Sequence, residues 1–365
     1  MLPLDTQFAE SIDGVSRALA EWAVALLYER NPGFDGLYGS NGRYLWKGEM
    51  VNRLQYLAEA IAVDRPVVFT QSVEWARAAF VAREMPVADL VESLLALDLT
   101  LRAELPAQIA ARAGKFIAEG ILIARSKPAL GRGPIASELE NENVDSMRAS
   151  LYLLHLLERK QAKAVDVLLD GVLSGKTVSE VYETIITPAL AEVGRMWHLK
   201  EATVADEHYV TAATQSAMSL LRSRLPMAEP NGKRILAASV GGDLHDVGIR
   251  MVADLLESDG WHVDCLGANM PPADIVEQLF DGNGEAQFDI VALSASTGLA
   301  LRMVANTISA IREAATGTTP STRCPAILVG GGPFAQIPDL WKVVGADGCA
   351  RSASDAVRAA GRVCA

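Results

Sequence analysis

The sequence lacks the features that mark several common protein classes. Only four cysteines occur among 365 residues, all in the last third, and no two form a C-x-x-C pair. This spacing argues against a disulfide framework, a zinc ribbon and a thioredoxin-like site, and favours buried free thiols. No uncharged apolar stretch reaches the roughly 18 residues that a membrane span needs. The N-terminal segment lacks a basic stretch followed by an apolar core, so we expect no secretory signal and a cytoplasmic location.

Clusters of positive charge are missing as well. The formal net charge is −12, from 33 Lys and Arg against 45 Asp and Glu. Phosphate contacts need basic residues gathered on one face, so we expect no direct binding to nucleic acid. Neither a Gly-x-x-x-x-Gly-Lys loop nor a Gly-x-Gly-x-x-Gly fingerprint is present. An NTPase or a dinucleotide enzyme therefore has no support in the phosphate-binding loops.

The chain is long enough for two or three domains, and its first third has helical periodicity. Apolar residues recur at intervals of three and four, for example at Ile12, Val15 and Leu19. We therefore expect an all-α N-terminal domain over residues 1–125. Residues 126–142 are rich in Pro, Gly and charge, which predicts a linker.

The remaining residues divide into a helical part and an α/β part. Four helical patterns over residues 143–228 predict a small four-helix bundle. From residue 233 to residue 365, short apolar runs alternate with helical segments, which predicts a parallel Rossmann-like or flavodoxin-like sheet. The expected strands are Ile235–Val240, His262–Leu266, Ile290–Ser294 and Ala326–Val329, with a fifth within Val344–Cys349. The expected helices are Val247–Ser258, Pro272–Phe280, Leu299–Ala315 and Ser354–Val363.

One short segment carries the strongest chemical signal. Gly242-Asp243-Leu244-His245-Asp246-Val247-Gly248 directly follows the first expected strand. There, His245 can present a neutral imidazole to a metal while Asp243 accepts the proton of the other ring nitrogen. The alternative is a surface or capping histidine, which is common in such loops. A second pattern upstream, Trp197-His198 followed by Glu207-His208, favours the functional interpretation.

Asp-x-His-x-x-Gly at this place resembles the signature of cobalamin-binding domains. Residues 143–365 resemble the cobalamin-binding module of methionine synthase, in which a helical cap precedes a Rossmann-like domain. The resemblance implies that His245 displaces the benzimidazole tail and binds cobalt from below, and that Asp243 orients the imidazole. Gly248 completes the motif and is assigned to the same cofactor-binding loop.

Two further loops follow expected strands, and ligands of such sheets bind outside the carboxyl ends of the strands. The resemblance implies that the Ser294 and Ser296 hydroxyls contact the buried nucleotide tail. Gly330, Gly331 and Gly332 would let the backbone approach the tail closely because they have no Cβ atoms. The alternatives are a hydroxyl that caps a helix, for Ser294, and a simple tight turn, for the glycines.

Trp197-x9-Glu207-His208 resembles the cap of the light-sensing adenosylcobalamin receptors. This resemblance implies that Trp197 packs against the adenosyl group and that Glu207 and His208 bond to its polar edges. His198 would take the upper cobalt position after light breaks the cobalt–carbon bond. The alternatives are a tryptophan in the bundle core and a solvated Glu-His helix start.

The added domain over residues 1–125 makes the chain resemble the photocobilins, which pair B12 with biliverdin. No winged-helix segment or basic recognition helix precedes the cap, so operator binding is not expected. The first cysteine is Cys265, so a bilin would be held without a thioether bond. Arg43, Lys47 and Arg53 would pair with its two propionates, although a solvated helix face explains them equally well.

These features leave two functions open. The first is a non-enzymatic light sensor that binds adenosylcobalamin and biliverdin and signals through altered self-association or a downstream protein partner. The second is a corrinoid shuttle that carries methylcobalamin for a methyltransferase and has no need of the Trp197 pattern. A mutase subunit is disfavoured because the chain has no barrel of about 250 residues. The sequence-based prediction is the light sensor.

Overall fold

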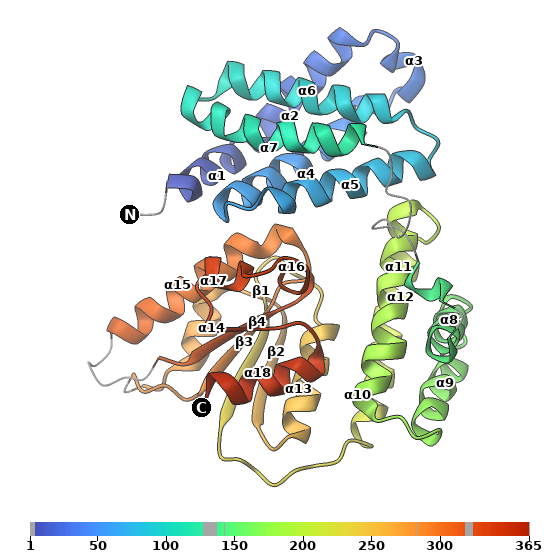
Figure 1. The fold of residues 1–365 in the computed structure, drawn as a ribbon, viewed down its shortest axis with the longest axis vertical. Helices are drawn as coiled ribbons and strands as arrows, with labels where there is room; N and C mark the ends of the chain where they lie inside the picture. Colours follow the sequence, from blue (N-terminus) through green and yellow to red (C-terminus); the bar gives the residue numbers. More distant parts are fainter. Residues whose placement is uncertain (1–3, 127–136, 142, 283, 318–323, 365) are drawn as a thin grey trace. The chain divides into compact units, whose positions relative to one another are not determined.

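The computed structural model describes residues 4–126, 137–141, 143–282, 284–317 and 324–364. Figure 1 shows two units, Met1–Ile135 and Ala136–Ala365. The predicted linker, residues 126–142, lies mostly outside the described residues. Its described end is not extended chain: residues Glu138–Glu140 form a 3-10 turn (η1), and Leu139 packs against the helices that follow.

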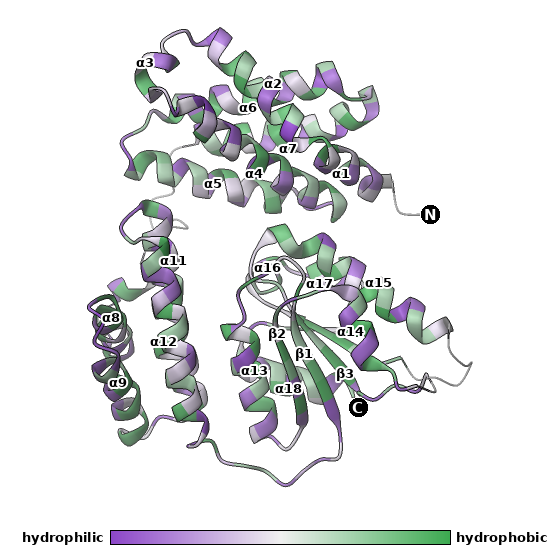
Figure 2. Ribbon diagram, turned by 180° about the vertical axis from the view of Figure 1, so that it is seen from behind, coloured by the Kyte–Doolittle hydropathy of each residue, from purple (hydrophilic) through white to green (hydrophobic). Residues whose placement is uncertain are grey.

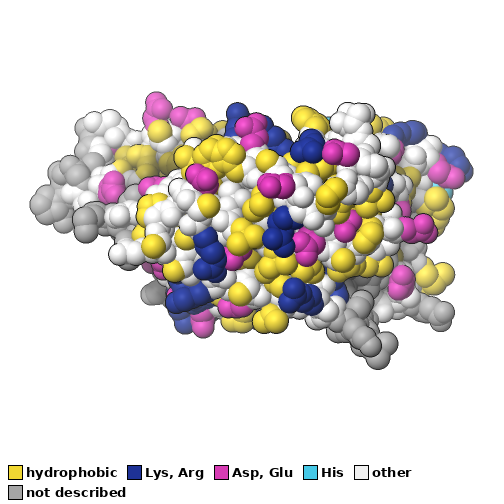
Figure 3. All heavy atoms as spheres, turned by 90° about the horizontal axis from the view of Figure 1, so that it is seen from above, with side chains coloured by type: hydrophobic (Ala, Val, Ile, Leu, Met, Phe, Trp, Pro, Cys, Tyr) yellow, Lys and Arg dark blue, Asp and Glu magenta, His cyan; other side chains and the backbone are white. Residues whose placement is uncertain are grey.

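Unit 1 consists of helices in its described part, which confirms the prediction of a helical N-terminal region. Its helices are α1 (Leu4–Gly14), α2 (Ser16–Arg30), α3 (Phe34–Tyr38), α4 (Gly42–Ala62), α5 (Pro66–Ala82), α6 (Val87–Glu104) and α7 (Ala107–Arg125). Helix α4 is central, because it packs against α1, α2, α5 and α7. On the face shown in Figure 3, basic and acidic side chains are interspersed among apolar ones.

The buried face of α4 contains an arginine. Arg53 is 3% exposed and lies among buried residues such as Met50, Leu54 and Leu57. Its three guanidinium nitrogens have no hydrogen-bond partner among the described residues, and the nearest carboxylate, on Glu49, is 3.8 Å away. Burial disfavours the charged form and lowers the pKa of Arg53 below its ordinary value. Arg53 is therefore a costly residue for the stability of unit 1.

Replacing this guanidinium by an apolar side chain should stabilise the protein. We expect Arg53→Met to raise the free energy of unfolding of unit 1 by about 1–2 kcal/mol, because the desolvated charge is removed. The melting temperature of unit 1 should rise by several degrees. Differential scanning calorimetry of the full chain measures this shift. Arg53→Lys, which keeps a buried charge, should give no gain. A lower melting temperature for Arg53→Met would show that the guanidinium has a stabilising partner.

Unit 2 begins with a helical layer, by which we mean residues 144–222. Its elements are α8 (Val144–Leu157), α9 (Gln161–Leu173), α10 (Val178–Val181), the π turn η2 (Tyr182–Ile186), α11 (Thr187–Leu199) and α12 (Val204–Arg222). Thr177 and Thr203 start α10 and α12 with capping boxes. Pro188 has no N–H to donate within the helix, which fits the widened π turn directly before α11.

The α/β part of unit 2 is a five-stranded parallel sheet of order β2-β1-β3-β4-β5, which confirms the predicted Rossmann-like fold. The strands are β1 (Arg234–Val240), β2 (His262–Met270), β3 (Ile290–Ser294), β4 (Ala326–Gly330) and β5 (Gly348–Ala350). The helices are α13 (Val247–Ser258), α14 (Pro272–Leu279), α15 (Leu301–Gly317), α16 (Gly332–Gln336), α17 (Leu340–Val343) and α18 (Ala353–Val363), with the 3-10 turn η3 (Gly298–Ala300). The strands of Figure 2 are mainly hydrophobic, as expected for a sheet covered by helices.

The expected strands and helices match closely, although α16 and α17 were not expected and the bounds of two strands differ clearly. Strand β2 extends four residues beyond the expected Leu266, to Met270. The fifth strand, expected within Val344–Cys349, occupies Gly348–Ala350, because a helix extends to Val343 and Gly345 turns the chain with φ +85°. Among the described residues no helix combines the length and apolar character needed to cross a bilayer.

Strand register brings the predicted site loops to one edge of the sheet. Ser239 of β1 pairs with Ser294 of β3, and Ser294 pairs with Gly330 of β4. Three strands thus end at one level, so the loops that follow them are neighbours. Helices α13 and α18 pack together on one face of the sheet, and α14 and α15 on the other (Figure 1). The helical layer shares an apolar core with α13.

Candidate functional site

The loop after β1 is organised around the carboxylate of Asp243, which is 4% exposed. One oxygen, Oδ1, accepts hydrogen bonds from Nδ1 of His245 at 2.8 Å and from the His245 backbone N–H at 3.0 Å. The other, Oδ2, accepts the backbone N–H of Ser296 at 2.5 Å. A single buried carboxylate therefore orients an imidazole and joins the loop after β1 to the loop after β3.

The imidazole of His245 is held on one side and open on the other. Its side chain is 63% exposed, and the Ser239 hydroxyl donates to the His245 carbonyl at 2.8 Å. With Nδ1 bound to Asp243, the neutral ring keeps its Nε2 lone pair for a further ligand. The loop thus has the geometry of a single, outward-facing nitrogen ligand.

Electrostatics within this pair favour the charged forms of both groups. The hydrogen bond to Asp243 raises the pKa of His245 above its ordinary value, and the nearby Glu207 and Asp246 raise it further against the effect of burial. Burial alone would raise the pKa of Asp243, but the hydrogen bonds from His245 and Ser296 outweigh it and lower that pKa. Asp243 is therefore a carboxylate over the physiological pH range.

Sequence reasoning missed two residues that support this loop. Asn269, in the left-handed region with φ +56°, accepts the Gly242 N–H at 2.7 Å and donates its own N–H to the Asp243 carbonyl at 2.9 Å. Asp246 accepts hydrogen bonds from Gln215 of α12 and from Arg250 of α13, both at 2.7 Å. Asp246 is part of the motif, so the sequence could have indicated its role. Nothing in the sequence indicates a role for Asn269, because only the pairing of β2 with β1 brings it close to the Asp243 loop.

The serine and glycine loops lie beside the His245 loop. The sequence predicted that glycine is needed for close approach to the nucleotide tail, but the structure shows another reason for it. A Cβ on Gly331, where φ is +106°, would overlap the carbonyl oxygen of Ala295, and one on Gly332 would lie 2.8 Å from the Ser296 carbonyl oxygen. Gly330 would meet the Ala350 carbonyl oxygen at 3.3 Å. The close approach that requires these glycines is between segments of the chain itself.

Ser294 and Gly248 lie at the end of β3 and in the first turn of α13. Ser294 ends β3 and is buried. Ser296 uses its backbone N–H for Asp243, which leaves its hydroxyl for other contacts. A Cβ on Gly248, in the first turn of α13, would meet no atom within 4 Å. The space in front of that turn is open.

The helical layer presents its predicted residues at or near the surface. Trp197 on α11 is 49% exposed, and His198 beside it is partly buried. On α12, Nδ1 of His208 lies 2.5 Å from Oε2 of Glu207, and the His208 side chain is 75% exposed. Glu207 is the member of this set that lies close enough to His245 to raise its pKa.

The three cations predicted to hold bilin propionates do not form one cluster. Arg43 pairs with Asp35 at 3.2 Å and lies over the Tyr28 ring, and Lys47 pairs with Glu21. Arg53 is buried in the core of unit 1, since it follows Lys47 by six positions and lies on another face of α4. These three residues therefore do not form the shared cationic surface that the sequence predicted.

Comparison with known proteins identifies the larger unit. Residues 233–360 match the family described as "B12 binding domain", and residues 151–222 match a second family with the same description. Unit 2 contains a cobalamin-binding module. Its α/β part holds the His245 loop, and the second match falls within the helical layer.

Relatives of this cobalamin-binding module are corrinoid proteins. Dimethylamine corrinoid protein 3 of Methanosarcina acetivorans is 27% identical over 180 residues, covering 49% of this chain and 79% of the relative. A corrinoid protein of Desulfitobacterium hafniense is 27% identical over 206 residues, covering 55% and 87%. Among solved structures, the monomethylamine corrinoid protein of Methanosarcina barkeri is 18% identical, with a TM-score of 0.49 and coverage of 57% and 93%.

The residues of the module fit a corrinoid whose cobalt would take one nitrogen ligand from the protein. His245 offers one nitrogen, and the buried Asp243 fixes the other. The Ser294 hydroxyl and the open space in front of Gly248 lie at the carboxyl ends of the strands, where ligands of such sheets bind.

The Asp243–His245 pair should be visible by titration of the cobalamin-free protein. We expect the His245 ring to titrate above pH 6.5, and Asp243→Asn to lower that pKa because the charged partner is lost. As the pH rises through the pKa the ring becomes neutral, so Nε2 becomes available to a metal only on the high-pH side. Ring 15N NMR measures the titration.

The chain supplies a matched control for this titration. Asp264 lies 3.3 Å from the His262 ring, far from the β1 loop in the sheet, so Asp264→Asn should leave His245 unchanged. An unchanged His245 pKa in Asp243→Asn would contradict the assignment of the pair.

Proposed function

We propose that this chain is a corrinoid protein that holds cobalamin with His245 as the lower axial ligand and works as a methyl carrier beside a separate methyltransferase. The observation that carries the proposal is the exposed His245 ring whose Nδ1 is bound to a buried carboxylate. The relatives named as dimethylamine corrinoid proteins support the methyl-transfer part.

Each group of the loop has a proposed role. The Nδ1–H of His245 is donated to Asp243, which keeps the ring in the tautomer whose Nε2 lone pair faces outward. Ser239 and Asn269 hold the loop backbone, so the ring keeps its direction when a ligand binds or leaves. The chemistry that cobalamin supplies when bound is reversible methyl transfer at cobalt.

The neighbouring loops and the helical layer complete the proposal. The Ser294 and Ser296 hydroxyls would bind the nucleotide tail at the carboxyl ends of β1 and β3. The helical layer would cover the upper face and exclude water, with Gln215 tying α12 to Asp246 of the His245 loop. We propose no catalytic residue for this chain, since a carrier leaves activation of the methyl donor to its partner.

The axial ligand can be identified by its nitrogen isotope. In protein labelled with 15N and loaded with unlabelled cobalamin, we expect the Co(II) EPR spectrum to show a two-line splitting from the axial nitrogen, because that nitrogen belongs to His245. Unlabelled protein should show three lines. His245→Ala should lose the protein-derived splitting while keeping its fold by circular dichroism. Three lines in the labelled protein would mean that the cofactor's own base is the ligand.

A second candidate, an adenosylcobalamin light receptor, is favoured by one observation. Trp197 leaves nearly half of its surface exposed on the helical layer, where a methyl carrier requires no large aromatic group. Such an indole could pack against an adenosyl group, with Glu207 and His208 available to its polar edges. Binding of biliverdin stays a prediction from the sequence, without the cation cluster it assumed.

The upper ligand separates the two candidates. The light-receptor candidate predicts that Trp197→Ala weakens binding of adenosylcobalamin about tenfold, because an aromatic contact is lost, while binding of methylcobalamin is kept. Binding is measured in the dark by absorption titration. Trp22→Ala is the control, since Trp22 in unit 1 is also 49% exposed. Equal effects on both cobalamins, and an adenosyl form unchanged by green light, would favour the methyl carrier.

A further inference from the structure

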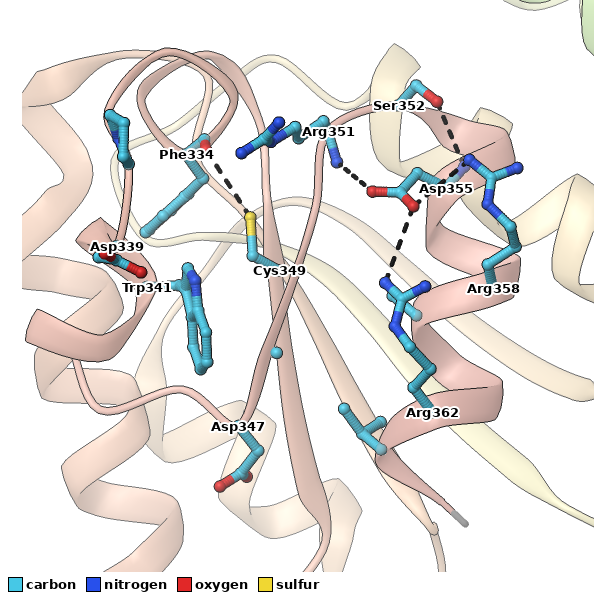
Figure 4. Close-up of a pocket in the computed structure, with 14 residues that line it drawn as sticks. Phe334, Asp339, Trp341, Asp347, Cys349, Arg351, Ser352, Asp355, Arg358 and Arg362 are labelled. Carbon is cyan, nitrogen blue, oxygen red and sulfur yellow. Dashed lines mark hydrogen bonds and ion pairs between the residues drawn. The ribbon is translucent and has the colours of Figure 1, made fainter.

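A groove lies beside the edge strand of the sheet, away from the His245 loop. Strand β5 pairs with β4 alone among the described strands, and its free side opens into a cavity of about 1010 Å³. Figure 4 shows this edge groove between two walls. Phe334 and Trp341 form one wall, and α18 forms the other. The volume is at the upper end of the range for small-molecule sites, about 300–1,000 Å³.

The α18 side of the edge groove carries unbalanced positive charge. Arg358 and Arg362 share one carboxylate oxygen of Asp355, at 3.4 and 3.8 Å. The Arg351 guanidinium has no ion pair or hydrogen bond among the described residues. Figure 4 shows its side chain reaching from the end of β5 toward Phe334. Three guanidinium groups thus face one cavity with one carboxylate between them.

The other carboxylates of the edge groove are already paired. Asp339 lies 2.8 Å from the amine of Lys342, and Asp347 lies 3.0 Å from the guanidinium of Arg312. Counting these partners and Glu183, whose carboxylate interacts with Arg358, five cations stand against four carboxylates, an excess of one positive charge. The chain as a whole has a net charge of −12, so this local excess is selective for anions.

The opposite wall offers aromatic surface. Phe334 is 3% exposed, and the Cys349 thiol donates to its carbonyl at 3.7 Å. The Trp341 indole is partly exposed, and Figure 4 shows it facing the groove across β5. A planar ring can stack on such a surface, while arginine forks bind phosphate oxygens in pairs.

We propose that the edge groove binds a nucleotide, with its base against Trp341 and its phosphates on Arg351, Arg358 and Arg362. This function is additional to the corrinoid site and does not depend on it. In the strand order, β5 is three positions from β1, which places the groove about 14 Å across the sheet from the His245 loop. An acidic peptide would use the charges but would leave the aromatic wall unexplained.

Isothermal titration calorimetry of the full chain with ATP tests the proposal. The two halves of the ligand, adenosine and tripolyphosphate, serve as separate probes. We expect Arg351→Gln combined with Arg358→Gln to weaken ATP and tripolyphosphate about tenfold, because paired charge-assisted hydrogen bonds are lost. Trp341→Leu should weaken ATP and adenosine but leave tripolyphosphate unchanged. Arg17→Gln, an exposed arginine of unit 1, is the matched control and should change nothing.

The same titration on protein saturated with hydroxocobalamin excludes an overlap of sites, because the cobalamin tail is itself a base, ribose and phosphate. Unchanged ATP binding supports a separate site. Displacement of ATP by hydroxocobalamin would assign the groove to the corrinoid, and would leave the His245 proposal standing. Absence of ATP binding at millimolar concentration, or tripolyphosphate binding equal to that of ATP without a Trp341 effect, would overturn the proposal. Circular dichroism verifies that each variant is folded.

Discussion

The cobalamin-binding module depends on one buried carboxylate. Asp243 is desolvated at the end of β1, and an isolated charge there would be strongly unfavourable. Three N–H donors make it tolerable: two from His245 and one from the backbone of Ser296. These bonds determine both the direction of the imidazole and the distance between the loops after β1 and β3. The geometry of the ligand and the packing of the sheet edge therefore have the same physical cause.

The helical layer is joined to the α/β part by a second set of polar contacts. The Tyr182 hydroxyl donates to Asp254 of α13 at 2.8 Å, and Arg222 of α12 approaches the same carboxylate at 3.4 Å. Burial raises the pKa of Asp254 and of Tyr182. Directional bonds of this kind specify one placement of the layer on α13, whereas the apolar core beneath them would tolerate sliding.

The sheet also explains how one domain can present two unlike surfaces. Its central strands end in loops joined by glycines, where backbone segments meet too closely for any Cβ. Its edge strand β5 has no second neighbour among the described strands, so a groove with side chains from α16, α17 and α18 remains open there. Arginines at such an edge also protect it from pairing with another strand. Charge at this edge has a structural use whether or not a ligand is bound.

The sequence by itself determined the helical N-terminal region, the parallel sheet and the Asp-x-His-x-x-Gly loop, because periodicity and turn residues are local signals. It did not show that Arg53 is buried while Arg43 and Lys47 are on the surface, since one helix can place its cations on different faces. Nor did it assign Asn269 or the reason for Gly331. Those depend on strand register and on contacts between loops distant in sequence, which only the tertiary structure decides.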